Sequence, residues 1–240
     1  MTLAIIFAGG SGVRMGSKVP KQFLELNGKP VLAHTLGLFE AHEKVDRIRV
    51  VAARENFARV EEICREYGIT KFDDVSEGGA SAQDSIYSGL VSARAAGYAD
   101  DTIVLLHDGV RPYVTPEVIA ANIEAVEKFG NAVTYTPCYE TIVLSRDGEK
   151  VDSMPLRRES YTAQAPQSFR LRDILAAHER IRAMEGGYTD MVDQATICHK
   201  LGIGVHLVEG NRGNVKITTP EDLVSLEALI KWRKNQVSRD

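Results

Sequence analysis

The sequence has few cysteines, no closely spaced cysteine pair and no long apolar run. Three cysteines among 240 residues are an odd number without a C-x-x-C spacing, which disfavours a disulfide framework or a structural zinc site. The apolar run near the N-terminus spans about five residues, far below the roughly 20 that a membrane-spanning helix needs. These absences predict a protein of the reducing cytoplasm that has no membrane anchor.

The sequence also has no excess of positive charge. Its 29 Lys and Arg residues stand against 33 Asp and Glu residues, giving a formal net charge of −4. General nucleic-acid and membrane-surface binders usually carry a basic face, so we expect neither partner. With 44% hydrophobic residues, the chain is long enough to bury a full core, and we expect a single domain over residues 1–240. Any anionic ligand would have to be met by locally concentrated charge.

Short apolar runs alternate with longer segments of helical periodicity. Near-continuous apolar runs, typical of a sheet covered on both faces, predict strands over residues 3–8, 48–53, 102–107 and 132–136. Apolar residues spaced three and four apart predict helices over residues 31–41, 56–67, 82–95 and 116–129. This alternation predicts an α/β fold with a doubly wound, mostly parallel sheet.

The alternation breaks near residue 139. The stretch "YETIVLSRDGEKVDSMP" is typical of two strands around a turn, which predicts a β-hairpin. We expect residues 139–163 to protrude from the domain as an arm. After the arm, the pattern predicts helices over 171–183 and 190–201 and from 220, and strands over 205–208 and 215–218.

Glycines and positive charges are concentrated in the loop after the first predicted strand, "AGGSGVRMGSKVPKQF" at residues 8–23. Ligands in such sheets bind at the carboxyl ends of the strands, where glycines allow backbone N–H groups to approach a polyphosphate. Arg14 and Lys21 would add charge. The loop lacks the G-K-[ST] ending of a Walker A motif, and Met15 stands where a dinucleotide fingerprint needs its third glycine. By itself, the loop is compatible with a triphosphate site or with a plain glycine-rich connection.

Two other predicted strand segments carry charged residues. Asp108 in "HDGVRP" follows a buried strand, with Arg111 three residues later. A carboxylate there suits Mg²⁺, and it equally suits a turn or a helix cap. Lys216 in "GNVKITTPEDL" lies in a short predicted apolar strand. A lysine there can simply face outward from the strand, so it indicates a binding site only together with other charged groups. His107 is more simply a core or turn histidine than a metal ligand.

Six motifs together carry a resemblance to a known family. In chain order they are "AGGSGVRMGSKVPKQF", "EGGASAQDSI", "HDGVRPY", "AQAPQSF", "YTDMVDQA" and "GNVKITTPEDL". This order resembles the polyol-phosphate cytidylyltransferases, which include the enzymes for 2-C-methyl-D-erythritol 4-phosphate and for ribitol 5-phosphate. The resemblance covers about residues 3 to 229. It implies a Rossmann-like nucleotidyltransferase fold, CTP as co-substrate and Mg²⁺ as cofactor.

The resemblance also implies roles for the matching positions. The nucleotide-binding residues would be Ala8, Gly9, Gly10, Gly12, Gly78, Gly79, Ser85 and Asp108, with Asp108 also the metal ligand. The catalytic residues would be Arg14, Lys21 and Lys216. The substrate-binding residues would be Arg111, Thr141, Arg157, Thr189 and Asp190. Because the hairpin matches the family's dimerisation arm, the resemblance implies a homodimer whose pocket is built across two subunits.

The residue types agree with this chemistry independently of the resemblance. A phosphate monoester has a second pKa of about 6 and is mostly dianionic at neutral pH, so its attack on the α-phosphorus of CTP needs no general base. The protein would supply positioning and positive charge while pyrophosphate leaves. That requirement fits a chain without a Ser-His-Asp or Cys-His signature.

Three positions bear on the acceptor and on the alternatives. Methylerythritol enzymes commonly carry Trp at the position of Tyr161 and Lys at that of Val143, whereas ribitol enzymes more often carry Tyr and the sequence "TIV". These positions slightly favour ribitol 5-phosphate over 2-C-methyl-D-erythritol 4-phosphate. Ala82 stands where many relatives have an arginine, which leaves an inactive nucleotide-binding relative as an alternative. An NAD(P)-dependent reductase is another, although it needs the missing third glycine.

Overall fold

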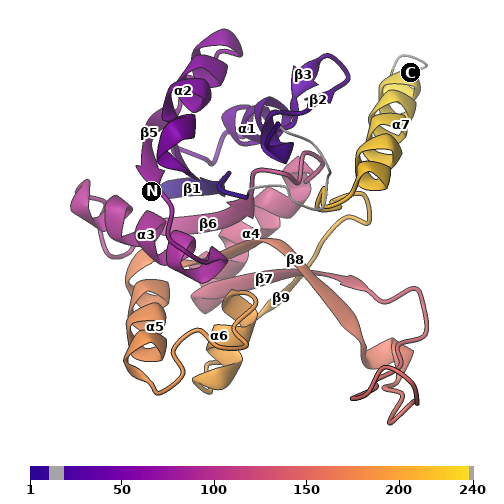
Figure 1. The fold of residues 1–240 in the computed structure, drawn as a ribbon. Coiled ribbons are helices and arrows are strands. Elements are labelled where there is room, and N and C mark those ends of the chain that lie inside the picture. The colour runs from indigo at the N-terminus through magenta and orange to yellow at the C-terminus, as the bar shows by residue number, and fades with distance from the viewer. Residues whose placement is uncertain (11–18, 238–240) are drawn as a thin grey trace.

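The computed structural model describes residues 1–10 and 19–237, and within them seven strands form one sheet (Figure 1). The strand order across the sheet is β5-β4-β1-β6-β8-β7-β9. The strands are β1 (Thr2–Phe7), β4 (Arg47–Ala52), β5 (Phe72–Glu77), β6 (Ile103–Asp108), β7 (Asn131–Pro137), β8 (Tyr161–Arg170) and β9 (Leu207–Glu209). Every neighbouring pair is parallel except the two pairs that involve β8.

The helices of the described residues lie on both faces of the sheet and beside it. They are α1 (Val31–Glu40), α2 (Phe57–Glu66), α3 (Ala82–Ala95), α4 (Pro116–Phe129), α5 (Leu171–Ala183), α6 (Gln194–Lys200) and α7 (Pro220–Val237). Helices α1, α2 and α4 contribute to the buried cluster on one face, and α3, α5 and α6 to the cluster on the other. The predicted doubly wound, mostly parallel α/β sheet is therefore confirmed.

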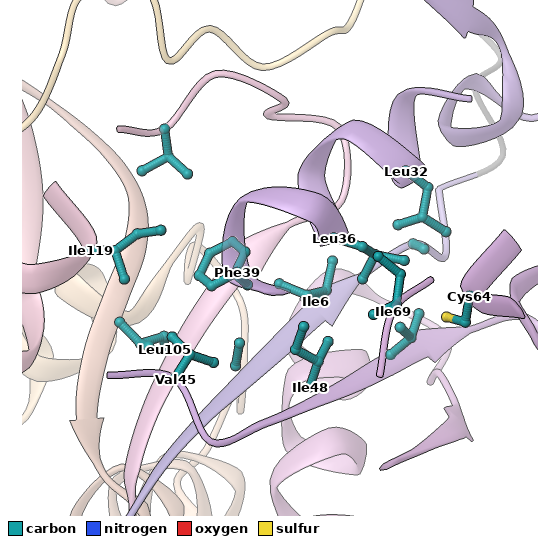
Figure 2. Packing of buried hydrophobic residues seen from close by; sticks show 14 of the residues in the cluster. Ile6, Leu32, Leu36, Phe39, Val45, Ile48, Cys64, Ile69, Leu105 and Ile119 are labelled. Carbon is teal, nitrogen blue, oxygen red and sulfur yellow. The ribbon is translucent and has the colours of Figure 1, made fainter. Parts of the chain in front are cut away.

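Strand β1 shows why its sequence predicts a central strand. Because side chains alternate between the two faces of a strand, Ile6 enters the cluster on the α1 face and Ile5 the cluster on the α3 face, both fully buried. Figure 2 shows the α1-face cluster, where Leu36 and Phe39 of α1 lie against Ile6. A strand that is buried on both faces needs an unbroken apolar run.

A smaller buried cluster connects the C-terminal helix with the end of β6. Leu226 of α7 belongs to the same cluster as Val110, Ile217 and Leu26. Leu26 lies in β2 (Glu25–Leu26), which pairs with β3 (Lys29–Pro30). The backbone N–H of Ile217 also donates to the carbonyl oxygen of Val110, at 2.9 Å. The chain after residue 213 thereby returns to the carboxyl ends of the central strands.

The arm differs in detail from the predicted hairpin. Strands β7 and β8 remain paired as far as Pro137 and Tyr161 and lead away from the other strands toward the arm (Figure 1). Between them the structure places one isolated bridge, Leu144 with Ser153, and a 3-10 turn at Arg157–Glu159, in place of the two expected strands. Most arm side chains are exposed, and an isolated two-stranded hairpin is only marginally stable without a packed face.

Other boundaries also differ from the sequence predictions. The helix expected over 190–201 begins at Gln194, and the segment 215–218 is irregular, not a strand. The sequence patterns did not predict strands β5 and β8. Strand β5 carries acidic residues, and β8 contains Pro166, a residue type that usually interrupts a strand. No helix in the described part of the chain has both the length and the apolar content to cross a membrane.

Candidate active site

The carboxyl ends of β1 and β6 lie side by side, and the candidate site begins there. Phe7 and Asp108, the last residues of these strands, are register partners, and the N–H of Gly109 donates to the carbonyl oxygen of Phe7 at 2.8 Å. On the other side of β1, the N–H of Ala8 donates to Val51 of β4 at 2.8 Å. Parallel pairing therefore brings Ala8, the first residue of the glycine-rich loop, next to the "HDGVRP" turn, although about 100 residues separate them in sequence.

Asp108 forms the charged centre of the site. Its Oδ1 accepts from Nζ of Lys216 at 2.7 Å, and its Oδ2 accepts from Nε of Arg111 at 2.8 Å. Its side chain is 24% exposed. Burial alone would raise the pKa of this carboxyl, but the charges and hydrogen bonds of Lys216 and Arg111 outweigh that effect and hold the pKa well below its usual range. Asp108 is therefore ionised and fixes two cations beside it.

Hydrogen bonds to backbone carbonyl groups position Lys21 and the segment that carries Lys216. The side-chain amide of Asn214, which is fully buried, donates to the carbonyl oxygen of Ala165 on β8 at 2.6 Å. Nζ of Lys21 donates to the carbonyl oxygen of Ile217 at 3.0 Å. The two lysines therefore arrive at the same place from opposite ends of the chain, because one irregular segment contacts both the strand ends and the N-terminal loop.

Two clefts meet at Asp108 and Lys216. The loop-side cleft, of about 360 Å³, contains most of the residues predicted to bind nucleotide or to act in catalysis: Ala8, Gly9, Gly10, Lys21, Gly79, Ser85, Asp108 and Lys216. The β8-side cleft, of about 290 Å³, shares Asp108 and Lys216 and adds Arg111 together with Gln164, Gln167, Val192, Asp193 and Gln194. Two ligands could therefore meet beside one cluster of positive charge.

The glycines of "EGGASAQDSI" are required by close contacts at the start of α3. A Cβ on Gly79 would collide with Cβ of Asp84, and a Cβ on Gly78 would lie 2.9 Å from Oγ of Ser85. The Ser85 hydroxyl accepts from the N–H of Gly79 at 3.0 Å. Ser81 caps α3 by accepting from the N–H of Asp84 at 3.1 Å. These contacts fix the part of the loop-side cleft that Gly79, Ser81 and Ser85 line.

His107 is fully buried and supports the turn that carries Arg111. Its Nε2 lies 3.2 Å from the carbonyl oxygen of Arg111, so Nε2 carries the proton in the neutral ring. Its ring centroid lies 5.0 Å from that of Phe39 in α1. Burial lowers the pKa of His107 to about 4, which makes the ring uncharged at neutral pH. The structure therefore agrees with the core or turn interpretation of this histidine.

Several predicted site residues lie outside the two clefts or outside the described residues. Gly12 and Arg14 fall outside the described residues. Thr141 and Arg157 lie in the arm, are exposed and line neither cleft. Thr189 and Asp190 line a separate cleft with Met184 and Lys200. The roles assigned to these residues remain predictions.

The sequence analysis missed the polar wall of the β8-side cleft. Gln167 of β8 donates from Nε2 to Oδ2 of Asp193 at 2.9 Å, and its Oε1 accepts from the N–H of Gln194 at 3.0 Å. Behind this wall, Nε2 of the fully buried His178 donates to Oε1 of Gln194 at 2.8 Å. The motifs "AQAPQSF" and "YTDMVDQA" contain Gln167, Asp193 and Gln194, but only the tertiary structure pairs these three residues across the cleft.

The chain is similar in sequence to a known family and to named enzymes. Residues 2–232 match the family described as IspD, 2-C-methyl-D-erythritol 4-phosphate cytidylyltransferase. The ribitol-5-phosphate cytidylyltransferase of Streptococcus agalactiae serotype V is 40% identical over 237 residues, which cover 98% of both chains. The 2-C-methyl-D-erythritol 4-phosphate cytidylyltransferase of Geotalea uraniireducens is 39% identical over 229 residues, covering 95% of this chain and 96% of that one.

The fold is also similar to that of solved structures. The crystal structure of 4-diphosphocytidyl-2C-methyl-D-erythritol synthase from Anaerococcus prevotii superposes with a TM-score of 0.81 at 28% identity, covering 96% of each chain. The likeness therefore extends over nearly the whole chain, in agreement with the family match.

The two buried histidines predict a pH dependence of stability. Burial lowers the pKa of both His107 and His178 to about 4, against about 6.5 in an unfolded chain. Between these values the unfolded chain binds more protons than the folded one, so the free energy of unfolding should fall as the pH falls from 6.5 toward 4. Each histidine should contribute a slope of up to about 1.4 kcal/mol per pH unit. Urea denaturation at several pH values measures the slope.

Two variants separate this effect from the titration of other groups. His107→Gln retains a donor toward Arg111 but cannot be protonated, so its slope should be smaller than that of the wild-type protein. His199→Gln, at an exposed histidine, should keep the wild-type slope. Equal slopes in the wild-type protein and in His107→Gln would contradict the assignment.

Proposed function

The chain belongs to the 2-C-methyl-D-erythritol 4-phosphate cytidylyltransferase (IspD) family, and from that premise we propose that it transfers CMP from CTP to ribitol 5-phosphate and releases pyrophosphate. Because the members of this family are cytidylyltransferases, the chain is a CTP-dependent nucleotidyltransferase and not an NAD(P)-dependent reductase. One observation carries the proposal: Asp108 holds Lys216 and Arg111 where the two clefts meet. CTP would occupy the loop-side cleft, and the acceptor the β8-side cleft.

The proposed reaction is an in-line displacement. An oxygen of the acceptor phosphate forms a bond to the α-phosphorus of CTP, and the bond from that phosphorus to the oxygen bridging to the β-phosphate breaks. The acceptor phosphate is mostly dianionic at neutral pH and needs no base. Lys216, Lys21 and Arg14 would stabilise the charge that develops on the phosphate oxygens. Asp108 would act by holding Lys216 and Arg111 in position.

The loop-side cleft also suits a divalent cation. Asp108 is the one acidic residue among the described residues that line this cleft, and Mg²⁺ often binds one or two carboxylates together with substrate phosphates. We therefore propose that Asp108 holds Mg²⁺ with the phosphates of CTP. When bound, the ion neutralises phosphate charge and helps pyrophosphate to leave.

The choice between the two acceptors rests on two arm residues. Relatives named for ribitol 5-phosphate and for 2-C-methyl-D-erythritol 4-phosphate are about equally similar to this chain. Tyr161 and Val143 favour ribitol, and both are about half exposed, at 47% and 52%. Methylerythritol phosphate is the second candidate acceptor.

The three unpaired cysteines support our proposal that the protein works in the cytoplasm, where thiols stay reduced.

We also propose a homodimer formed through the arm. Seven large hydrophobic side chains of the arm are between 47% and 60% exposed: Tyr139, Val143, Leu144, Val151, Met154, Leu156 and Tyr161. A concentration of exposed apolar side chains is typical of an interaction surface. Thr141 and Arg157 lie in the same arm and outside both clefts of their own chain. In a dimer, the arm of one subunit could bring these two residues to the acceptor site of the other.

An activity assay tests the proposed function. The protein, CTP and Mg²⁺ should release pyrophosphate on addition of ribitol 5-phosphate, with a higher kcat/KM than for 2-C-methyl-D-erythritol 4-phosphate. ATP, GTP and UTP should replace CTP poorly. A higher kcat/KM for methylerythritol phosphate would reverse the acceptor assignment, and the absence of pyrophosphate with both acceptors would indicate an inactive relative.

Lys216 should be essential for turnover. Loss of one electrostatic donor at such a site typically lowers turnover by about 10²–10³, so Lys216→Ala should lose at least that factor in kcat while keeping its fold. Lys44→Ala is a matched control, because Lys44 is also 42% exposed and also forms an ion pair, with Glu124 at 2.8 Å. Steady-state kinetics and circular dichroism measure both variants. Near-normal kcat in Lys216→Ala would remove this lysine from the catalytic residues.

Charges placed in the arm should separate the subunits. In Val151→Asp/Leu156→Asp, light scattering should report a mass of 26.4 kDa in place of twice that value. The kcat/KM for the acceptor should fall about 10-fold or more, because substrate-positioning residues would be withdrawn. Val224→Asp, at a position of α7 that is 66% exposed, should change neither. A wild-type protein that is monomeric at assay concentrations would refute the dimer.

A further inference from the structure

We propose that Asp193 recognises hydroxyl groups of the acceptor's polyol chain and so determines which polyol phosphate is used; this inference rests on the proposed function. Groups of different chemistry line the β8-side cleft at two places. Arg111 and Lys216, the only cationic side chains among the described residues that line it, are bound to Asp108 at the end of β6. The Asp193 carboxylate, which lines the cleft together with three glutamines, is bound to Gln167, the register partner of Leu106 two residues earlier in β6.

This polarity orients the acceptor. A phosphate dianion is attracted to Arg111 and Lys216 and repelled by the Asp193 carboxylate. The uncharged polyol chain must then extend toward Asp193. A carboxylate accepts hydrogen bonds and donates none, which suits the hydroxyl groups of a polyol and disfavours a second phosphate or a carboxylate at that end.

The hydrogen bonds of Asp193 leave one acceptor position open. Its Oδ1 accepts from the N–H of Thr196 at 2.8 Å and from the Thr196 hydroxyl at 2.7 Å. Its Oδ2 accepts from Nε2 of Gln167 at 2.9 Å. Each carboxylate oxygen has two lone pairs, so Oδ1 is fully used and Oδ2 retains capacity for one more donor. A hydroxyl in the cleft could supply that donor.

The neighbouring side chains hold Asp193 in one orientation. Oε1 of Gln167 accepts from the N–H groups of Gln194 and Ala195, at 3.0 and 3.2 Å, so the amide of Gln167 cannot turn over without losing both bonds. Nδ1 of His178 accepts from the Tyr188 hydroxyl at 2.6 Å while its Nε2 holds Gln194. A supported acceptor discriminates between ligands better than a mobile one, because its position is fixed before binding.

Gln164 offers a second open acceptor on the same cleft. Its Oε1 is buried and has no hydrogen-bond partner in the described structure, and a Cβ on Gly210 would lie 2.8 Å from it. An unpaired buried oxygen is unfavourable until a donor reaches it. Ribitol 5-phosphate carries one hydroxyl more than 2-C-methyl-D-erythritol 4-phosphate and has an unbranched chain, so it offers one donor more to the two open acceptors.

Acceptor selectivity tests the inference. Asp193→Asn preserves the size of the side chain and its ability to cap α6, but it replaces the charged acceptor. The kcat/KM for ribitol 5-phosphate should fall about 10-fold or more, mainly through KM, since hydrogen bonds to charged groups have this strength. The KM for CTP should not change. Asp173→Asn, on an exposed residue of α5, is the control and should match the wild-type protein.

A shortened acceptor distinguishes recognition from support of the fold. Erythritol 4-phosphate lacks one carbon and one hydroxyl of ribitol 5-phosphate, so the wild-type enzyme should prefer ribitol 5-phosphate, and Asp193→Asn should lose most of that preference. Gln164→Met, which removes the second open acceptor, should also reduce it. If Asp193→Asn lowers kcat/KM equally for both acceptors, or for neither, the inference is wrong. If the wild-type enzyme turns over no polyol phosphate, the proposed function is wrong and this inference with it.

Discussion

The ion pair between Asp108 and Lys216 connects residues 108 positions apart in sequence, and the site is organised around it. A partly buried carboxylate needs compensating charge, because leaving it unpaired costs several kcal/mol. Arg111 provides part of that compensation from the turn after β6, and Lys216 provides the rest from a segment that forms no strand. The irregular segment 213–217 therefore has one position relative to the sheet, which its backbone hydrogen bond to Val110 reinforces.

Fixing two cations around one carboxylate also leaves the site with excess positive charge. Lys21 adds to this excess from the N-terminal loop. In a chain of net charge −4, such a concentration makes this one place attractive to phosphate groups. The clefts on either side of the cluster have different walls: glycines and backbone on the loop side, and amide and carboxylate side chains on the β8 side. One charged cluster can thus serve two substrates that are recognised by different chemistry.

The sequence predicted the parts of this arrangement that follow from local patterns. Near-continuous apolar runs identified β1, β4, β6 and β7, because strands that are buried on both faces tolerate few polar residues. Asp108 directly follows one of these predicted strands, so its place at the carboxyl edge was predictable. Strand β8 was not predictable, because Pro166 and two glutamines interrupt its apolar pattern. The arm was predicted as a projection, but its pairing is reduced to one bridge, since it has no packed face to stabilise two strands.

The sequence by itself therefore determined the α/β class, the order of the central elements and the family, because ordered motifs and apolar periodicity are local properties of the chain. Only the tertiary structure decided which distant groups meet. It brought Lys216 to Asp108 and placed Gln167 beside Asp193. Such contacts depend on where an antiparallel strand and two irregular segments pack against the sheet, and packing of this kind is set by long-range burial and charge pairing, which leave no regular pattern in the sequence.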